Sequence, residues 1–252
     1  MKRYSLVVVY SLLMCLAIKA QKTVDWYPKV DEATATFVNH NGDEEQIEEG
    51  NTYDAPLTVT LSANPIDTTG YEIRYEWKLE QIKNGASKLL ARRNEEVTTY
   101  TFTEGGADVS YSITLAITYS LRGEDNWFEV EAEPITFVLD GSSLELYNAF
   151  SPNGDGTNDV FRVKTRSLLS FRMKIFNRWG QEVVSGDQNT LPTEYENDHV
   201  YYVCWDGTYH GSKVEDGVYF ILVEAEGSDG IKYVKRGDIN ILTSSTRKED
   251  KQ

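Results

Sequence analysis

Three blocks of sequence decide the fold of the second half of the chain: AFSPNGDGTNDVF (residues 149–161), FNRWGQEV (176–183) and WDGTYHGSKVEDGVYF (205–220). Each block joins a turn rich in Gly, Asn and Asp to residues that favour strands. Glycine suits such turns because it adopts left-handed backbone conformations that a Cβ atom penalises. The pattern therefore predicts a compact antiparallel β domain with Trp179 and Trp205 in or near its core.

In this order, the three blocks resemble the type B, or gliding-motility-associated, C-terminal sorting domain of proteins exported by the bacterial type IX secretion system. The resemblance covers about residues 144–242 and implies an Ig-like sandwich. It also implies that sorting proteins of the type IX system recognise the domain at the outer membrane, that the chain reaches the cell surface or the medium, and that a surface glycolipid is a further candidate partner. The residues that carry the motifs are Ser151, Pro152, Asn153, Gly154, Asp155, Gly156, Asn177, Arg178, Trp179, Gly180, Trp205, Asp206, Gly207, Asp216, Gly217 and Tyr219.

The sequence departs from the family pattern at two places. About 20 residues (186–205) separate FNRWG from WDG, where the family has a shorter link. A polar tail at residues 243–252 follows the last expected strand.

The first 20 residues are typical of a signal peptide that directs export through the inner membrane. Lys2 and Arg3 precede an apolar run of about 13 residues (6–18), which is too short to span a bilayer. We expect cleavage after Ala20, and lipidation at Cys15 is the alternative. No later apolar run is long enough for a transmembrane segment.

The charge of the chain excludes one class of partner. Its formal net charge is −15, and loss of Lys2, Arg3 and Lys19 with the signal peptide would make it −18. Such a charge repels phosphate backbones, so we expect no nucleic-acid binding. Cys204 would then be the one remaining cysteine. We expect it to be a buried strand thiol, with a redox or intermolecular role as the alternative.

Residues 25–139 predict an Ig-like or PKD-like sandwich, because short alternating segments recur with turns between them. Trp77 on a middle strand and Tyr111 near the start of a late strand occupy positions that such domains use for a core Trp and a corner Tyr. The Gly/Ser segment 139–148 marks the boundary between the two sandwiches. Strands are expected at 33–38, 55–65, 71–82, twice within 87–104, and at 109–121 and 127–139.

In the second domain, residues 220–237 predict a hairpin, and residues 168–171 suggest a helical turn. The acidic runs 43–49 and 194–198 are interpreted as solvated loops. Further strands are expected at 160–163, 171–177, 182–185, 200–204, 218–226 and 232–242.

One loop carries residues that can bind a metal. Asn153, Asp155, Thr157 and Asp159 place oxygen ligands at every second position, as a Ca²⁺ loop does. Arg162 stands where an EF-hand has its bidentate glutamate. The alternative is a structural loop whose side chains bond to nearby backbone amides. No other cofactor is expected.

The remaining polar motifs suggest structure. Asp206 and Asp216 each precede a glycine and are interpreted as turn formers, and the many tyrosines as packing residues. The adhesion-like tripeptide at residues 236–238 is interpreted as part of a strand.

Nothing in the sequence indicates catalysis. His40, His199 and His210 are the only histidines and stand in loop-like contexts, and no hydrolase, zinc or phosphate-loop motif occurs. The leading hypothesis is a non-enzymatic surface protein of two β domains, a component, shuttle or secretion-status signal of the sorting system. The alternative is a Ca²⁺-dependent adhesin or glycan-binding module.

Overall fold

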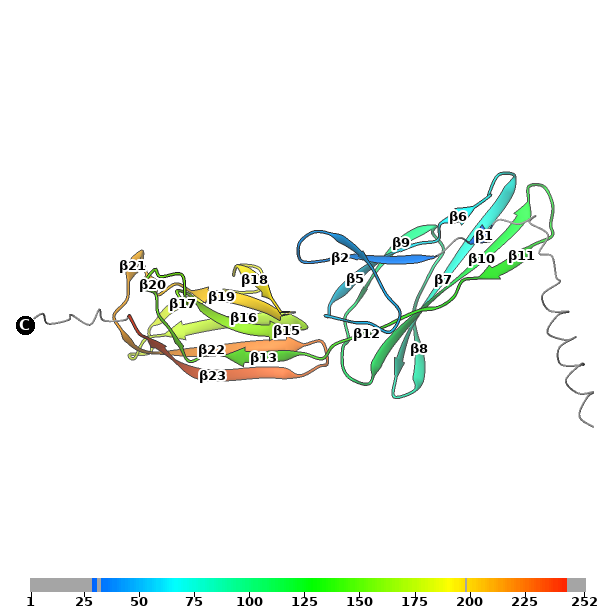
Figure 1. Cartoon of the computed structure of the whole chain (residues 1–252). Coiled ribbons are helices and arrows are strands. Elements are labelled where there is room, and N and C mark those ends of the chain that lie inside the picture. Colours follow the sequence, from blue (N-terminus) through cyan, green and yellow to red (C-terminus); the bar gives the residue numbers. More distant parts are fainter. Residues whose placement is uncertain (1–28, 31–32, 198, 244–252) are drawn as a thin grey trace, which may run out of the picture.

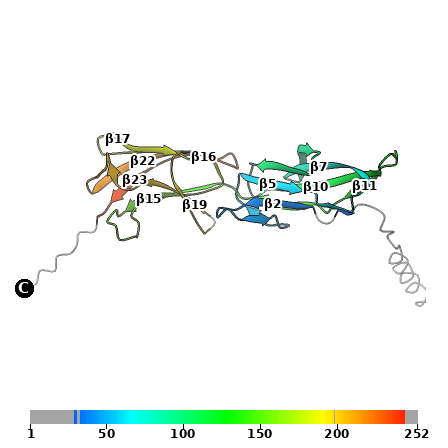
Figure 2. The same cartoon turned by 90° about the horizontal axis from the view of Figure 1, so that it is seen from above.

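Two β domains follow one another along an elongated molecule in the computed structural model (Figures 1 and 2). The structure describes residues 29–30, 33–197 and 199–243, and among these residues every regular element is a strand. The expected signal peptide, the Cys15 alternative and residues 244–252 of the tail lie outside the described residues. The fold class predicted from the sequence, all-β with two Ig-like sandwiches, is confirmed.

The first domain is a sandwich of a four-stranded and a six-stranded sheet, with a small two-stranded ribbon beside them. The four-stranded sheet has the order β3 (Glu44–Gln46), β2 (Thr34–Val38), β5 (Leu57–Ser62), β9 (Val97–Phe102). The other has the order β4 (Thr52–Tyr53), β12 (Ile135–Leu139), β10 (Val109–Leu121), β7 (Tyr71–Lys83), β8 (Ala86–Arg93), with β11 (Phe128–Glu131) also on β10. The ribbon pairs β1 (Lys29–Val30) with β6 (Pro65–Ile66).

The core of the first domain contains the two residues that the sequence singled out. Trp77 is fully buried, and its Nε1 donates to the carbonyl of Glu95 at 3.0 Å. The Tyr111 hydroxyl donates to the carbonyl of Glu104 at 2.6 Å, seven residues upstream. That bond is the one that defines a tyrosine corner in Ig-like sandwiches. The sequence prediction for both residues is confirmed.

The second domain is also a sandwich of two sheets. One has the order β13 (Ser143–Leu146), β15 (Phe161–Arg166), β19 (His199–Trp205), β18 (Thr193–Glu196). The other has the order β14 (Ala149–Phe150), β23 (Lys232–Ile241), β22 (Gly217–Gly227), β16 (Leu168–Phe176), β17 (Glu182–Asp187). A small ribbon of β20 (Thr208–Tyr209) and β21 (Ser212–Lys213) completes it. The strand pairs of the two sheets are antiparallel, except for the parallel pair of β14 and β23. As predicted, β22 and β23 form a hairpin.

Two local predictions were wrong. Residues 168–171 are not a helical turn but the start of β16, because Phe171 alternates with Met173 and Ile175 into the core. The acidic runs are not simply loops: they contain the edge strands β3 and β18. Glutamates are tolerated there because an edge strand keeps them in solvent, and they oppose self-association through the open edge.

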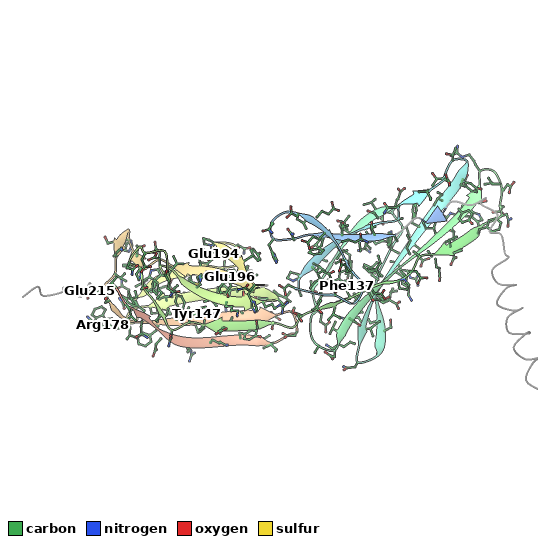
Figure 3. All side chains as sticks on the ribbon, in the orientation of Figure 1. Phe137, Tyr147, Arg178, Glu194, Glu196 and Glu215 are labelled. Atoms are coloured by element: carbon green, nitrogen blue, oxygen red, sulfur yellow. The ribbon has the colours of Figure 1, made fainter. Side chains whose placement is uncertain are left out.

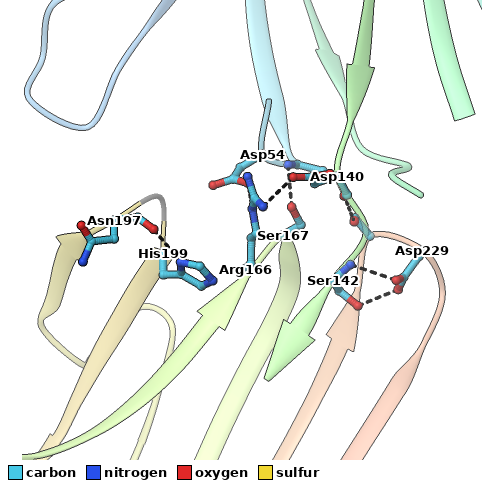
Figure 4. A network of polar contacts seen from close by, with 10 residues as sticks. Asp54, Asp140, Ser142, Arg166, Ser167, Asn197, His199 and Asp229 are labelled. Carbon is cyan, nitrogen blue, oxygen red and sulfur yellow. Dashed lines mark hydrogen bonds and ion pairs between the residues drawn. The ribbon is translucent and has the colours of Figure 1, made fainter. Parts of the chain in front are cut away.

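The two domains meet at a network of polar contacts, shown in Figure 4. Arg166, at the end of β15, reaches back to two carboxylates, Asp54 between β4 and β5 and Asp140 directly after β12. The distance from its Nε to Asp54 is 2.6 Å, and the distance from an Nη atom to Asp140 is also 2.6 Å. The backbone N–H of Ala55 donates to the Ser167 hydroxyl at 3.1 Å. Because charged groups and backbone atoms of both domains take part, this junction couples them directly.

The loop between β22 and β23 also belongs to the junction. Ser142 in the linker donates from its backbone N–H and its hydroxyl to the two carboxylate oxygens of Asp229, at 2.8 and 2.6 Å. Gly105 donates its N–H to the carbonyl of Ser228 at 3.2 Å. On one flank, the His40 ring stacks on Tyr195 with centroids 3.9 Å apart. The linker is therefore held on both sides, and the far end of the second domain is left free.

Candidate functional site

The three motif blocks meet at the end of the second domain that lies away from the junction. We call this the motif end and define it by residues 151–159, 177–181, 206–217 and 242–243. Figure 3 shows Arg178 and Glu215 there. Lys213 donates to the carbonyl of Pro152 at 2.8 Å, and Gln181 donates to the hydroxyl of Tyr209 at 3.1 Å. These bonds tie the third block to the first and to the second.

The first loop, residues 151–159, is closed by its own side chains. The two carboxylate oxygens of Asp159 accept the N–H groups of Gly154 and Gly156 at 2.6 and 2.7 Å. These backbone donors stabilise the charged form, so they hold the pKa of Asp159 below its usual value. Asp155 and Asn153 accept further loop amides at 2.8 and 2.9 Å.

The predicted Ca²⁺ ligands therefore lie together, and loop amides already bond to the oxygens of Asn153, Asp155 and Asp159. Carboxylate oxygens have lone pairs left for a cation, so the Ca²⁺ site stays a prediction beside the structural alternative. Within the part of the chain that the structure describes, no three His, Cys, Asp or Glu side chains gather as a metal site.

The second loop corrects a prediction. Trp179 was expected in or near the core, but 74% of it is exposed. The Asn177 side chain accepts the N–H groups of Trp179 and Gln181, both at 3.0 Å, and so builds a tight turn between β16 and β17. At the tip of this turn the indole stands outside both sheets, with the Arg178 guanidinium 4.1 Å from its ring centre. The residue type alone does not indicate that Trp179 is exposed, whereas the N-x-x-G pattern of residues 177–180 indicates a turn at this position.

The third block confirms the prediction for Trp205, which is 4% exposed. Its ring packs against Phe150 and Tyr219, with centroids 5.6 and 4.9 Å away. Its Nε1 donates to the carbonyl of Thr208 at 2.7 Å. A buried Trp needs such an acceptor, and the WDGT turn supplies it.

Turn chemistry fixes the block around Trp205. Asp206 accepts the N–H and the hydroxyl of Thr208 at 2.9 and 2.7 Å, as its predicted turn role requires. Gly207 has a φ of +77°, and a Cβ there would lie 2.8 Å from the Pro152 ring. Glycine is thus required both for the backbone and for contact with the first loop. Asp216 accepts the N–H of Thr243 at 3.2 Å and also contacts its hydroxyl, a tie to the C-terminal strand end that the sequence did not reveal.

A narrow slot opens beside Trp179. It has a volume of about 60 Å³ and is lined by residues 177–179 and 215–219. Next to it, Val218 and Phe220 on the outer face of β22 are each 44% exposed. The sequence missed this patch because residues 218–223 of β22 form an unbroken apolar run, so alternation does not reveal which of these side chains face solvent.

The other candidate residues serve structural roles. Cys204 is 3% exposed, and burial raises the pKa of its thiol to about 12, which confirms the predicted buried thiol. His199 was expected in a loop but begins β19, and its Nδ1 lies 2.7 Å from the carbonyl of Asn197. Arg236 and Asp238 of the adhesion-like tripeptide lie on β23, opposite Leu222 and Phe220.

None of the described residues forms a helix that could cross a membrane.

Comparison with protein families gives one match. Residues 144–241 match the family described as CHU_C Type IX secretion signal domain. The match begins at the first strand pair of the second sandwich and ends at the last residue of β23. It therefore covers the three motif blocks of the motif end and all strands of the second sandwich except the first residue of β13. No curated protein matches the chain.

Solved structures resemble the chain only distantly. A tetra-tandem repeat in the extending region of a large adhesion protein is 13% identical, with a TM-score of 0.28 over 84% of this chain and 67% of that one. Dimeric latent PorU from Porphyromonas gingivalis is 13% identical, with a TM-score of 0.27 over 86% of this chain and 20% of that one. BcpA, the major pilin subunit of Bacillus cereus, is 12% identical, with a TM-score of 0.26 over 86% of this chain and 67% of that one.

Proposed function

Because residues 144–241 form a type IX secretion signal domain, we propose that the motif end is the surface by which the type IX machinery takes hold of this protein. The family marks a chain for export to the cell surface or the extracellular space. The first domain then travels as a small non-enzymatic passenger.

The observation that carries this proposal is the exposure of Trp179. An indole that is 74% exposed contributes little to folding, whereas the other Trp of the domain is buried. Exposed Trp and Arg side chains are the ones that contribute most when a partner covers them. Trp179 with Arg178 over its ring, next to the slot and to Val218, forms such an anchor.

The arrangement of the molecule supports the same conclusion. The opposite end of the second domain is occupied by Arg166 and its two carboxylate partners from the first domain. A receptor at the outer membrane therefore has free access to the motif end, while the passenger stays away from it (Figure 1). The C-terminal strand also ends here, where Thr243 bonds to Asp216.

The small passenger favours a role within the sorting system itself, as a component, a shuttle or a signal of secretion status. A first domain of about 115 residues (25–139) is small for an adhesin or an enzyme. It also prompts a comparison with PorA, a small protein of that system, and this likeness remains a prediction.

Two variants of the full chain test the proposal in a bacterium that has the type IX system. Deletion of residues 144–252 should abolish surface location, measured by protease shaving and by immunoblot of cell fractions. Trp179→Ala should leave the melting temperature unchanged and reduce the exported fraction severalfold, with the protein accumulating in the periplasm.

The matched control is Leu169→Ala. Leu169 is also exposed, at 42%, and lies on β16, the strand that leads to Trp179, but at its opposite end. Export of this variant should equal that of the wild type. The proposal fails if the truncated chain still reaches the surface, or if both alanine variants lower export equally.

A further inference from the structure

A groove of about 770 Å³ opens along one side of the first domain. One wall is formed by the end of β3 and the residues after it, 46–49, and the other by residues 130–135 of β11, β12 and the segment between them. The groove thus lies between the edge of one sheet and the edge of the other. It is remote in sequence from the motif end.

The groove exists because the edge strand of the larger sheet is interrupted. β11 and β12 both pair with β10, and residues 132–134 between them belong to neither strand. The Ala132 N–H still donates to the Leu115 carbonyl of β10 at 2.9 Å, so the break falls at residues 133–134. Pro134 has no N–H group to donate and cannot continue a regular strand. On the β12 side of this break the two walls are joined, since the Gly50 N–H donates to the Thr136 carbonyl at 2.9 Å and the Val138 N–H donates to the Asn51 carbonyl at 3.0 Å. On the β11 side the groove separates the two walls.

The floor of the groove is apolar. Ile47 and Ala33 belong to the core and are 4% and 9% exposed, and Ala132 and Ile135 pack against that core while half-buried. An open sandwich edge with an apolar floor is the kind of site that takes an added extended segment. Backbone hydrogen bonds then hold the segment, and its alternate side chains enter the floor.

The rim carries four glutamates: Glu48, Glu49, Glu131 and Glu133. All four are exposed, and within the described residues no Lys or Arg forms an ion pair with them. Glu48 accepts a hydrogen bond from the Asn51 side chain at 2.9 Å. On β7, which lies beyond β10 in the same sheet, Glu76 by contrast pairs with Arg92, and Glu80 pairs with Lys78 at 2.8 Å. The rim is therefore an uncompensated negative surface.

We propose that this groove binds an extended segment of a partner protein in which Lys or Arg alternates with small aliphatic residues. The aliphatic side chains meet Ile47 and Ala132 on the floor, and the cationic side chains meet the glutamate rim. The segment adds to the edge of β11 at Val130 and Glu131, beside the groove, on the side of the strand away from β10. A second copy of this chain fits poorly, because its net charge of −15 opposes close approach of the two.

This inference is independent of the export function. It concerns what the passenger domain does after delivery, and it holds or fails whatever the motif end binds.

The test uses the chain without its first 20 residues and a fluorescent eight-residue peptide of alternating Lys and Val. Anisotropy at low salt should show saturable binding, and the same peptide with Glu in place of Lys should not bind. Glu131→Lys with Glu133→Lys should weaken binding at least tenfold, since both charges on that wall are reversed. The matched control reverses two exposed glutamates that lie neither on β11 nor in the groove, Glu72→Lys with Glu124→Lys, and should change the Kd less than twofold.

Hydrogen exchange separates docking from general charge attraction. Bound peptide should slow exchange in β11 and leave β8, the edge at the opposite side of the same sheet, unchanged. The proposal is overturned if the control pair weakens binding as much as the groove pair, or if β8 is protected equally.

Two further results would assign the groove to a different occupant and would also overturn the proposal. One is a dimer in sedimentation that the Glu131→Lys with Glu133→Lys variant abolishes, which would place a second copy there. The other is peptide binding only after residues 21–28 are removed, which would show that the chain fills its own groove.

Discussion

The two ends of the second domain are built from the same sandwich and differ in how their side chains are used. At the junction end, Arg166, Ser167 and Asp229 bond to groups of the first domain or the linker. At the motif end, Asn177 and Asp159 bond to amides of their own loops, and Trp179 is left largely exposed. Bonds between domains fix an orientation, whereas bonds within a loop fix a shape and leave its outer surface available to a partner.

The largest expected effect concerns the two tryptophans of the second domain. Trp205→Ala removes a ring that packs on Phe150 and Tyr219, so it should lower the free energy of unfolding of the second domain by about 3–5 kcal/mol. Trp179→Ala should change it by less than about 0.5 kcal/mol, because the ring is exposed. Urea unfolding followed by circular dichroism measures both. Equal losses of unfolding free energy in the two variants would mean that the Trp179 indole stabilises the folded domain as much as Trp205 does.

The next effect tests the junction end. Arg166→Met removes the cation that two partly exposed carboxylates share, and should cost about 1–2 kcal/mol, between the values for exposed and buried pairs. Rotational correlation times from NMR should also show the two domains tumbling more independently. Arg172→Met is the control, because its pair with Glu224 at 2.7 Å lies on the exposed face of the second domain alone. If Arg172→Met loosened the domains as much, Arg166 would have no special role in coupling them.

A smaller effect depends on pH. Burial by itself raises the pKa of Asp229, but hydrogen bonds from Ser142 and Ile231 outweigh it and hold the pKa below the usual value. A carboxyl with a lowered folded-state pKa adds stability above its unfolded pKa, near 4, and loses it as the pH falls through the folded value. The contribution of Asp229 to the free energy of unfolding should therefore be lost as the pH falls below about 4.

Asp229→Asn should make the acid-dependent loss of stability smaller and should cost about 1 kcal/mol at pH 7. Asp238→Asn, which removes an exposed charge from β23, serves as the control and should keep the acid-dependent loss. If the free energy of unfolding of Asp229→Asn depended on pH as strongly as that of the wild type, the Asp229 carboxylate would not contribute to the acid-dependent stability of the junction.

The smallest expected effect is that of calcium on the first motif loop. The loop closes through the contacts of Asp159 with Gly154 and Gly156, so its shape needs no cation. We expect melting temperatures with Ca²⁺ and with chelator to agree within about 1 °C, because only a ligand that binds the folded state raises them. A clear rise with Ca²⁺ would favour the adhesin alternative and would make this loop its metal site.

Local pattern predicted the fold well where alternation and turn chemistry agreed. β7 and β10 were visible because Trp77 and Tyr111 lie on clear period-2 runs, and the β22–β23 hairpin followed from its SDG turn. The edge strands β3 and β18 were missed because charged residues mask the pattern there.

Positions of side chains relative to solvent were harder to predict. Trp179 and Trp205 have similar flanking glycines, yet only the long-range pairing of β15 with β19 and of β22 with β23 decides which ring is enclosed. The contacts of the junction could not be predicted for the same reason, because they join residues that are distant in the sequence: Arg166 and Asp54 are 112 residues apart.

The burial of Cys204 has a practical consequence. Cys204 lies on β19 and belongs to the core of the second domain, and a pKa of about 12 keeps its thiol protonated at neutral pH. The Cys204 thiol should therefore not react with alkylating reagents or oxidants in the folded chain, whereas it should react rapidly once the domain unfolds. Labelling of the Cys204 thiol can thus report, in intact cells, whether the second sandwich is folded or unfolded at each stage of export.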